Sequence, residues 1–333
     1  MKIFVSGVAG FLGSHLADIF IKDKHSVIGC DNLIGGNLQN VNPAIEFHQV
    51  DCNNFDAMRR LTNGCDIVYH CAATAYEGLS VFSPHLITKN IVTASTAVFS
   101  AAIQNNVDRI IFCSSMARYG KNATPFKETY TTNPQDPYGI GKVCAENILK
   151  NLCDIHSINY VIAVPHNIIG PRQKFDDPYR NVAAIMINLM LLGRQPIIYG
   201  DGKQKRCFSF IDDNIYCLKE MALNPDVCGQ TINIGPDEEF IEIIELAKLI
   251  ADLLGFKLAP IFMPNRPQEV KLANCSADKA RQLLGYKTTV SLSDGIQSMI
   301  DYVKDRGPKE FMYHVDLEII NGKTPKTWKD RMF

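Results

Sequence analysis

Three side chains of this chain could together take a proton from an alcohol. Tyr138 and Lys142 are four residues apart in a stretch with a helical pattern, so both are expected on one helix face. A phenol, whose ordinary pKa is about 10, is a poor base at neutral pH, but a neighbouring ammonium group stabilises its phenolate. Ser115, at the end of an apolar run, could hold the same alcohol and share its proton. The three residues predict oxidation of an alcohol whose carbon gives up a hydride.

The start of the chain is typical of a binding site for the hydride acceptor. An apolar run over residues 3–5 is followed by a glycine-rich turn, and an apolar helical pattern begins within that turn. Glycine permits a tight turn and close approach of a ligand, and the N-terminal end of a helix attracts a pyrophosphate. The residues expected to bind a dinucleotide here are Gly7, Gly10, Phe11, Leu12 and Gly13.

Asp31 indicates which dinucleotide is bound. It ends a second apolar run, roughly 20 residues after the glycine-rich turn, where a carboxylate binds a ribose 2′-hydroxyl and disfavours a 2′-phosphate. We therefore predict NAD rather than NADP. The polar segment 32–37 either wraps the adenosine half of the dinucleotide or forms a surface turn. Further cofactor contacts are predicted at Asn32, Gly36, Asn37, Asp51, Ala72 and Ala73.

The elements that must position these groups alternate along the chain. Apolar, strand-like runs are separated by helical patterns, as at 55–61, 83–105 and 138–156. This alternation predicts an α/β fold with a Rossmann-type, doubly wound parallel sheet and helices on both faces. Ligands bind beyond the carboxyl ends of the strands in such a sheet, so the predicted cofactor residues share one edge.

Composition and charge exclude several classes of partner. The chain has 333 residues, 46% hydrophobic and 21% charged, and its formal net charge is −1 without a basic cluster, which argues against nucleic acid and anionic membranes. We expect no apolar run long enough to cross a bilayer and no room for a signal peptide before the first strand. Eleven cysteines without a CxxC pair predict buried, reduced thiols and a cytoplasmic protein. Eight histidines without ligand spacing predict no metal site.

Taken together, the motifs resemble the extended short-chain dehydrogenase/reductase family, and within it the nucleotide-sugar epimerases and dehydratases. The resemblance covers about residues 1–300. It rests on the glycine-rich turn, Asp31, Ser114-Ser115, Tyr138 with Lys142, Asn167-x-x-Gly170-Pro171-Arg172, and the segments 200–213 and 266–285. It implies an NAD-binding domain over 1–165, a smaller α/β nucleotide-sugar domain over 166–305 with segments returning to the main sheet, and a C-terminal extension over 306–333. It also implies a homodimer through helices near 83–105 and 138–156.

The resemblance implies further site residues. Arg206 and Arg266 become candidates for the diphosphate of a nucleotide sugar, with Asn167 and Arg172 assisting, and UDP is the most frequent nucleotide in the family. Additional cofactor residues are Cys52, Asn90 and His166. Ala273 stands where epimerases restricted to glucose and galactose carry Tyr, which implies a roomy pocket for a substituted hexose.

The family's enzymes all oxidise the sugar at C4, and the residues after the catalytic serine separate their later steps. Dehydratases and decarboxylases carry acidic residues there, whereas this chain has Met116 and Ala117, so we predict 4-epimerisation through a transient 4-keto sugar. Glu77 could bind a hydroxyl or supply another acid-base group, and a dehydratase or 4-keto reductase using Glu77 is the alternative. A non-catalytic dinucleotide-binding regulator is a third hypothesis. Arg118, where the family usually has Val, is expected to put a charge near the site or on its rim.

Overall fold

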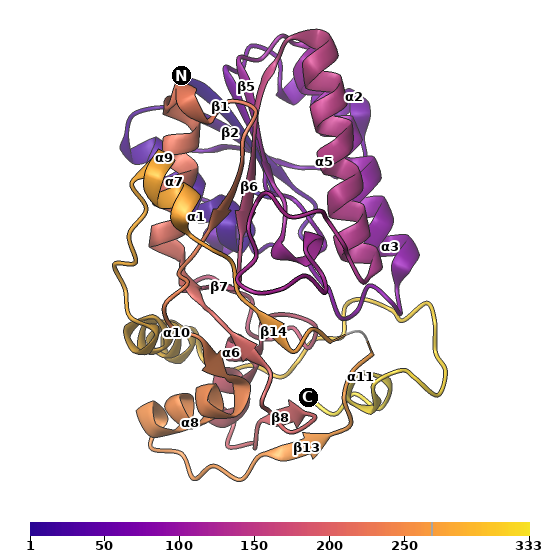
Figure 1. The fold of residues 1–333 in the computed structure, drawn as a ribbon, viewed down its shortest axis with the longest axis vertical. Helices are drawn as coiled ribbons and strands as arrows, with labels where there is room; N and C mark the ends of the chain where they lie inside the picture. The colour runs from indigo at the N-terminus through magenta and orange to yellow at the C-terminus, as the bar shows by residue number, and fades with distance from the viewer. Residues whose placement is uncertain (268) are drawn as a thin grey trace.

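The computed structural model describes residues 1–267 and 269–333, and a seven-stranded parallel sheet forms its centre (Figure 1). The spatial order is β11-β6-β5-β4-β1-β2-β3, and each neighbouring pair is parallel. The strands are β1 (Lys2–Ser6), β2 (Ser26–Asp31), β3 (Glu46–Gln49), β4 (Ile67–His70), β5 (Arg109–Cys113), β6 (Asn159–Pro165) and β11 (Thr231–Ile234). This arrangement confirms the predicted Rossmann-type sheet.

Helices cover both faces of the sheet, so its central strands are apolar on both sides. In β1, Ile3 and Val5 pack into one core and Phe4 into the other, and none of the three is exposed. One face carries α1 (Phe11–Lys22), α7 (Ile211–Leu223) and α9 (Asp278–Leu284). The opposite face carries α2 (Phe55–Leu61), α4 (Ala94–Gln104) and α5 (Pro137–His156).

The predicted helical stretch 83–105 is divided by a change of pitch. It consists of α3 (Pro84–Thr88), a π-helical turn η2 (Lys89–Thr93) and α4. As a whole, Pro84–Gln104 is long and apolar enough to cross a membrane by length and composition, contrary to the sequence expectation, with a mean hydropathy of 1.4. Half of this window is buried inside the protein, where the helix packs against α2 and α5, and burial in a core accounts for the same composition.

A second lobe lies beyond the carboxyl ends of the strands. Its core joins α6 (Val182–Leu191), α8 (Ile243–Leu254) and α10 (Leu292–Arg306). Its short strands are β7 (Ile168–Ile169) with β10 (Ser209–Phe210), β8 (Ile197–Tyr199) with β13 (Ile261–Met263), and β9 (Lys205–Arg206) between β12 (Ile241–Glu242) and β14 (Leu272–Ala273). The strand β11 and the helices α7 and α9 come from the second half of the chain but pack on the main sheet.

The remaining short elements are connections and the end of the chain. They are the 3-10 turns η1 (Leu38–Asn40), η3 (Met116–Arg118) and η4 (Pro225–Val227), and the helix α11 (Lys326–Lys329). The segment 307–333, here called the C-terminal tail, leaves α10, runs beneath α3 and returns to the second lobe (Figure 1).

Candidate active site

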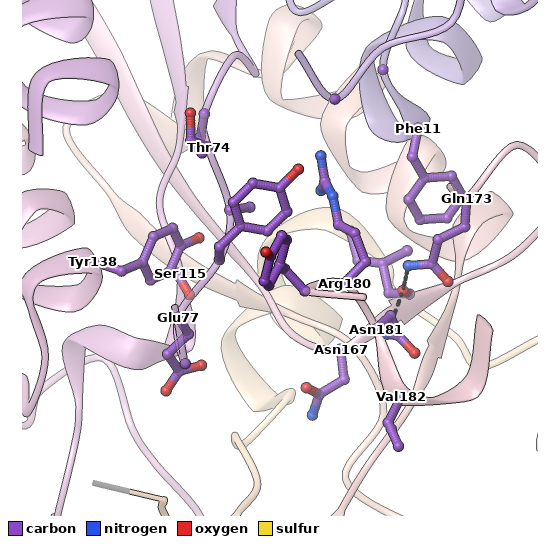
Figure 2. Close-up of a pocket in the computed structure, with 18 of the residues that line it drawn as sticks. Phe11, Thr74, Glu77, Ser115, Tyr138, Asn167, Gln173, Arg180, Asn181 and Val182 are labelled. Carbon is purple, nitrogen blue, oxygen red and sulfur yellow. Dashed lines mark hydrogen bonds between the residues drawn. The ribbon is translucent and has the colours of Figure 1, made fainter. Parts of the chain in front are cut away.

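A cavity of about 490 Å³ lies between the carboxyl edge of the main sheet and the second lobe. Residues of both halves of the chain line it, from the turn after β1 to the C-terminal tail. Figure 2 shows part of this lining, from Phe11 to Val182. This is the edge at which doubly wound sheets bind their ligands. The volume is sufficient for a ligand of several hundred daltons.

The glycine-rich turn forms the floor of one half of the cavity. Gly7 has φ +74°, and a Cβ atom at this position would lie 2.9 Å from the backbone of Ala72. A Cβ atom at Gly13 would collide with the carbonyl oxygen of Gly7. Glycine is therefore required where β1 turns into α1, and the residues Gly7, Gly10, Phe11, Leu12 and Gly13 all line the cavity.

Asp31 lies at the end of β2 with its carboxylate held by the backbone. It accepts hydrogen bonds from the amides of Leu33 (2.7 Å) and Ala9 (3.1 Å), and Gly36 packs directly against it. Burial raises the pKa of Asp31, while these amide bonds act in the opposite direction. Each carboxylate oxygen keeps a further lone pair for a ribose hydroxyl. A 2′-phosphate beside this carboxylate would be repelled. Asp31, Gly36 and the glycine-rich turn, here called the cofactor cradle, therefore fit NAD.

Most of the other predicted cofactor residues line the same half of the cavity. The side chain of Asn32 donates to Asp51 (2.9 Å), and that of Asn90 donates to Thr74 (2.9 Å). The predicted residues that line the cavity are Asn32, Gly36, Asp51, Cys52, Ala72, Ala73 and Asn90.

Two predicted cofactor residues, Asn37 and His166, are not part of the cavity lining, so their contact with the cofactor stays a prediction. The side chain of Asn37 caps η1 by accepting from the amide of Gln39 at 3.0 Å. His166 follows Pro165 at the end of β6 and is buried, with its Nε2 atom 2.9 Å from the carbonyl oxygen of Pro236. Successive side chains at a strand end point to opposite sides, so Pro165 and Asn167 reach the cavity and His166 points away.

Ser115, Tyr138 and Lys142 come together at the carboxyl end of β5. Asp136 caps α5 by accepting from the amide of Gly139 at 2.9 Å, and the helix then presents Tyr138 and Lys142 to the cavity. Figure 2 places the side chains of Tyr138 and Ser115 beside each other. Lys142 donates from Nζ to the carbonyl oxygen of Cys113 at 2.7 Å, and its Nζ lies 5.9 Å from the centre of the Tyr138 ring.

Burial opposes charge on both members of the Tyr–Lys pair. It raises the pKa of Tyr138, against which the neighbouring Ser115 hydroxyl acts, and it lowers the pKa of Lys142 to about 8. An additional positive charge close to the phenol would favour the phenolate. The phenol of Tyr138 therefore keeps its proton near neutral pH unless a cationic group lies next to it.

The cavity brings together predicted substrate residues from both halves of the chain. Arg206 donates to the carbonyl oxygens of Val270 (2.7 Å) and Lys205 (2.8 Å), which fixes its guanidinium group. The guanidinium of Arg266 lies 4.6 Å from the centre of the Tyr199 ring. The predicted substrate residues in the lining are Glu77, Ser115, Asn167, Arg206 and Arg266.

Glu77 lines the cavity, and its side chain is exposed to the cavity space (Figure 2). Loss of surrounding water raises the pKa of Glu77 to about 7, and the nearby carboxyl group of Asp136 acts in the same direction. Arg206 and Arg266 act against this rise. A carboxyl group in this state can both donate and accept a proton near neutral pH.

Comparisons with known proteins agree with this geometry. Residues 3–235 match the NAD dependent epimerase/dehydratase family. The chain belongs to this family. A curated relative, the putative UDP-glucose 4-epimerase of Methanocaldococcus jannaschii, is 33% identical over 309 residues, covering 91% of this chain and 98% of the relative. The family's cofactor confirms the prediction of NAD.

Solved structures of similar proteins have the same fold as this epimerase/dehydratase family member. The UDP-glucose 4-epimerase of Thermotoga maritima, solved with UDP-glucose, is 29% identical with a TM-score of 0.88, over 92% of this chain and 99% of its own. The UDP-glucuronic acid 4-epimerase of Bacillus cereus, solved with UDP-glucuronic acid and NAD, is 31% identical with a TM-score of 0.85, over 92% of this chain and 100% of its own.

This family member departs from the sequence interpretation at two arginines. Arg172 has φ +67° and forms an ion pair with Asp18 of α1 at 2.6 Å, and it is not part of the cavity lining. Arg118 is buried and forms an ion pair with Glu146 of α5 at 2.9 Å. It therefore ties the end of β5 to α5 rather than placing a charge near the site or on its rim. Ala273 is also absent from the lining and lies in β14 beside Arg206.

Arg180 is a cavity residue that the sequence motifs do not indicate. It lies in the loop before α6, with its guanidinium 5.0 Å from the centre of the Tyr76 ring, and it points into the middle of the cavity (Figure 2). It lies close to Gly35, and its charge acts on both Asp31 and Tyr138. The one signal for a binding role of Arg180 is its position beyond the carboxyl ends of the strands, where such sheets bind ligands.

Proposed function

We propose that this chain is an NAD-dependent nucleotide-sugar 4-epimerase acting on a UDP-hexose or a substituted UDP-hexose. The observation that carries the proposal is the placement of Ser115 and Tyr138 in one cavity with the glycine-rich turn and Asp31. Met116 and Ala117 follow the serine, so neither can transfer a proton. The similarity to 4-epimerases over nine-tenths of the chain supports the same reaction.

Each catalytic residue of this chain has a separate role in the proposed reaction. NAD held at the glycine-rich turn and Asp31 would supply the acceptor for a hydride from C4 of the sugar and the donor for its return. Ser115 holds the C4 hydroxyl group and Tyr138 takes its proton, which leaves a 4-keto sugar. When the ketone has turned its other face to the cofactor, Tyr138 returns the proton to the oxygen, so protons and electrons balance over the cycle. Lys142, four residues along the same helix face, stabilises the phenolate.

Two arginines support binding of the substrate through a nucleotide diphosphate group. Arg206 and Arg266 line the second-lobe half of the cavity, and Asn167 lines the same cavity. A guanidinium group binds phosphate oxygens with two parallel hydrogen bonds. The relatives solved with UDP-sugars support UDP as the nucleotide, and we propose this for the present chain.

Glu77 supports a second candidate reaction on the same scaffold. Its position in the cavity and its pKa of about 7 would suit proton transfer at a carbon or oxygen next to C4. A dehydratase or a 4-keto reductase would then result. Epimerisation needs no group beyond Ser115, Tyr138 and Lys142, so it is the primary proposal.

The test is incubation of the purified protein with UDP-glucose, UDP-N-acetylglucosamine and UDP-glucuronic acid, followed by proton NMR of the sugar. We expect interconversion at C4 without net consumption of cofactor, and near-complete loss in Tyr138→Phe with retained NAD. An unsaturated or 4-keto product would favour the second candidate. Bound NAD without turnover of any nucleotide sugar would contradict both.

The outer face of α5 supports a homodimer. Ile140 and Ile155 are 54% and 66% exposed, and a shallow depression lies on the same helix between them. Exposed apolar side chains gathered on one helix are typical of a protein interface. We propose that α5 pairs with its copy in a second chain. We also propose a cytoplasmic protein, because its cysteines are free, including the exposed Cys144 of α5, and free thiols remain reduced there. Light scattering of Ile140→Glu should report a monomer, and an unchanged dimer would contradict this interface.

A further inference from the structure

We propose that the C-terminal tail is a substrate-binding element: Trp328 and Phe333 form a wall of the substrate half of the cavity, and Thr327 holds Arg266 in place through Tyr199. Both aromatic residues line the cavity and are almost fully buried, at 4% and 8% exposed. The identity of the ligand as a nucleotide sugar rests on the proposed function. The placement of the tail against the cavity does not.

The tail is fixed to the segment that carries the sugar-side residues. The carboxylate of Glu318 accepts from the amides of His85 (2.9 Å) and Leu86 (2.8 Å) at the start of α3. The carbonyl oxygen of Phe82 accepts from the amide of Glu318 at 2.9 Å. These bonds bring the tail against the chain that follows Glu77. An element held at both its middle and its end can define the shape of a cavity wall.

Trp328 borders the place where sugar and diphosphate would meet. Its indole donates to the carbonyl oxygen of Pro178 at 3.2 Å, and its ring packs edge-on against Tyr179 with 5.6 Å between centres. A Cβ atom built on Gly78 would lie 3.4 Å from Trp328 and 3.4 Å from Arg266. The indole and the guanidinium therefore flank Gly78, directly after Glu77. A larger residue at Gly78 would press on both.

Thr327 connects the tail to the proposed diphosphate ligand. Its hydroxyl group is hydrogen-bonded to the hydroxyl of Tyr199, and the guanidinium of Arg266 lies 4.6 Å from the centre of the Tyr199 ring. The same guanidinium forms an ion pair with Glu269 at 3.1 Å. A cation over an aromatic face is also held electrostatically, so the ring and this carboxylate together set the position of the cation. Thr327 is accordingly a positioning residue that acts through Tyr199.

A second contact joins the tail to the centre of the cavity. His314 Nε2 lies 3.0 Å from the hydroxyl of Tyr76, which also donates to Asp177 at 2.7 Å. The ring of Tyr76 carries the guanidinium of Arg180 on its face. The tail therefore contacts the supports of both cavity arginines that lie nearest to it, Arg180 and Arg266.

The solved relatives leave a small share of this chain unmatched. They are matched over 99–100% of their own lengths by 92% of this chain, and the unmatched share has the size of the tail. An apolar wall that excludes water strengthens the interaction of the arginines with an anionic ligand. We therefore expect loss of the wall to weaken nucleotide binding.

The experiment compares single variants of the full chain with their NAD bound. Trp328→Ala and Thr327→Val are measured against Ile320→Ala, a control in the same tail whose side chain is 60% exposed. The readouts are the Kd of UDP by calorimetry, KM and kcat for UDP-glucose, the NAD content and the melting temperature. Trp328→Phe tests whether an aromatic ring alone restores binding.

We expect Trp328→Ala to raise the Kd of UDP and the KM about tenfold, as for removal of a buried aromatic contact, with unchanged NAD content. Thr327→Val should raise them by a smaller factor, and Ile320→Ala should not change them. Unchanged Kd and KM in both test variants, with melting temperatures like the parent, would overturn the proposal. Loss of UDP affinity in both variants, without turnover of any sugar by the parent, would contradict the proposed reaction. The same result would support the role of the tail in binding.

Discussion

The Nζ atom of Lys142 lies 2.7 Å from the carbonyl oxygen of Cys113, so a single hydrogen bond joins the helix that carries Tyr138 to the strand that ends before Ser115. The bond holds the buried ammonium group 5.9 Å from the centre of the Tyr138 ring. The three catalytic candidates are thus fixed relative to each other by the sheet and α5, before any ligand binds.

Lys142→Met should remove the hydrogen bond to Cys113. It should also remove the effect of the buried charge on the free energy of unfolding. The folded-state pKa of Lys142 is about 8, and that of an unfolded lysine is about 10.4. Between these values the unfolded state binds more protons, so this lysine makes the free energy of unfolding rise with pH from about 8 to 10. Urea unfolding of the ligand-free protein at several pH values should show this rise in the parent but not in Lys142→Met. The variant should also lose at least about a hundredfold in kcat. Equal pH slopes in the two proteins would contradict the buried position.

Asp31→Asn should weaken NAD binding about tenfold or more, because the variant loses a charged acceptor for the ribose hydroxyls. Affinity for NADP relative to NAD should rise, since the repulsion of a 2′-phosphate is removed. Asn37→Ala is the matched control from the same loop, because its side chain caps η1 outside the cavity lining. NAD affinity is measured on protein stripped of cofactor. A larger loss in Asn37→Ala than in Asp31→Asn would show that the cradle is assigned wrongly.

Arg266→Met and Arg172→Met should differ, although both arginines belong to motifs of the family. Arg266 lines the cavity, and its loss should raise the Kd of UDP by about tenfold to a hundredfold, as for a charge-assisted contact. Arg172 pairs with Asp18, and both side chains are about 30% exposed, so its loss should leave UDP affinity unchanged. The stability change should stay within about 1 kcal/mol. Calorimetric titration of UDP into both variants decides between the two assignments.

Glu77→Gln tests whether a carboxyl group is required for the chemistry. Its pKa is about 7 in the folded state and about 4.3 in an unfolded chain, so the folded state binds more protons between these values. The parent should therefore lose stability as pH rises from about 4.5 to 7, and this loss should be absent in the glutamine variant. We expect C4 interconversion to continue within about tenfold of the parent rate. A loss of a hundredfold or more, with NAD and UDP still bound, would favour the dehydratase or reductase.

Arg118→Val should destabilise the protein by about 3–5 kcal/mol, because it leaves the buried carboxylate of Glu146 without its cation. Adding Glu146→Gln to this variant should restore part of the stability, since the uncompensated charge is removed. Chemical denaturation of the two single variants and the double variant measures the coupling. Additive effects would mean that the ion pair does not hold β5 to α5.

Local patterns in the sequence were sufficient for the sheet and the cofactor cradle. The apolar run before Gly7 and the run ending at Asp31 became β1 and β2, because both faces of a parallel sheet are covered and its strands read as continuous apolar segments. Spacing alone also placed Tyr138 and Lys142 on one side of a helix. These features depend on residues close together in the chain.

Side-chain direction in loops could not be inferred in the same way. Arg172 and His166 follow motifs that lead the backbone to the cavity, yet the left-handed φ of Arg172 and the strand-end alternation at His166 turn both away. The polar partners that receive them, Asp18 and the carbonyl oxygen of Pro236, are distant in sequence. No pattern in the sequence links those pairs.

The sequence by itself determined the kind of sheet, the dinucleotide turn and the candidate base, because hydrophobic periodicity and glycine conformation act locally along the backbone. Only the tertiary structure decided that Arg180 points into the cavity and that the tail closes it with Trp328. Both outcomes depend on packing between segments far apart in the chain. Such packing is set by shape and burial in three dimensions rather than by the order of residues.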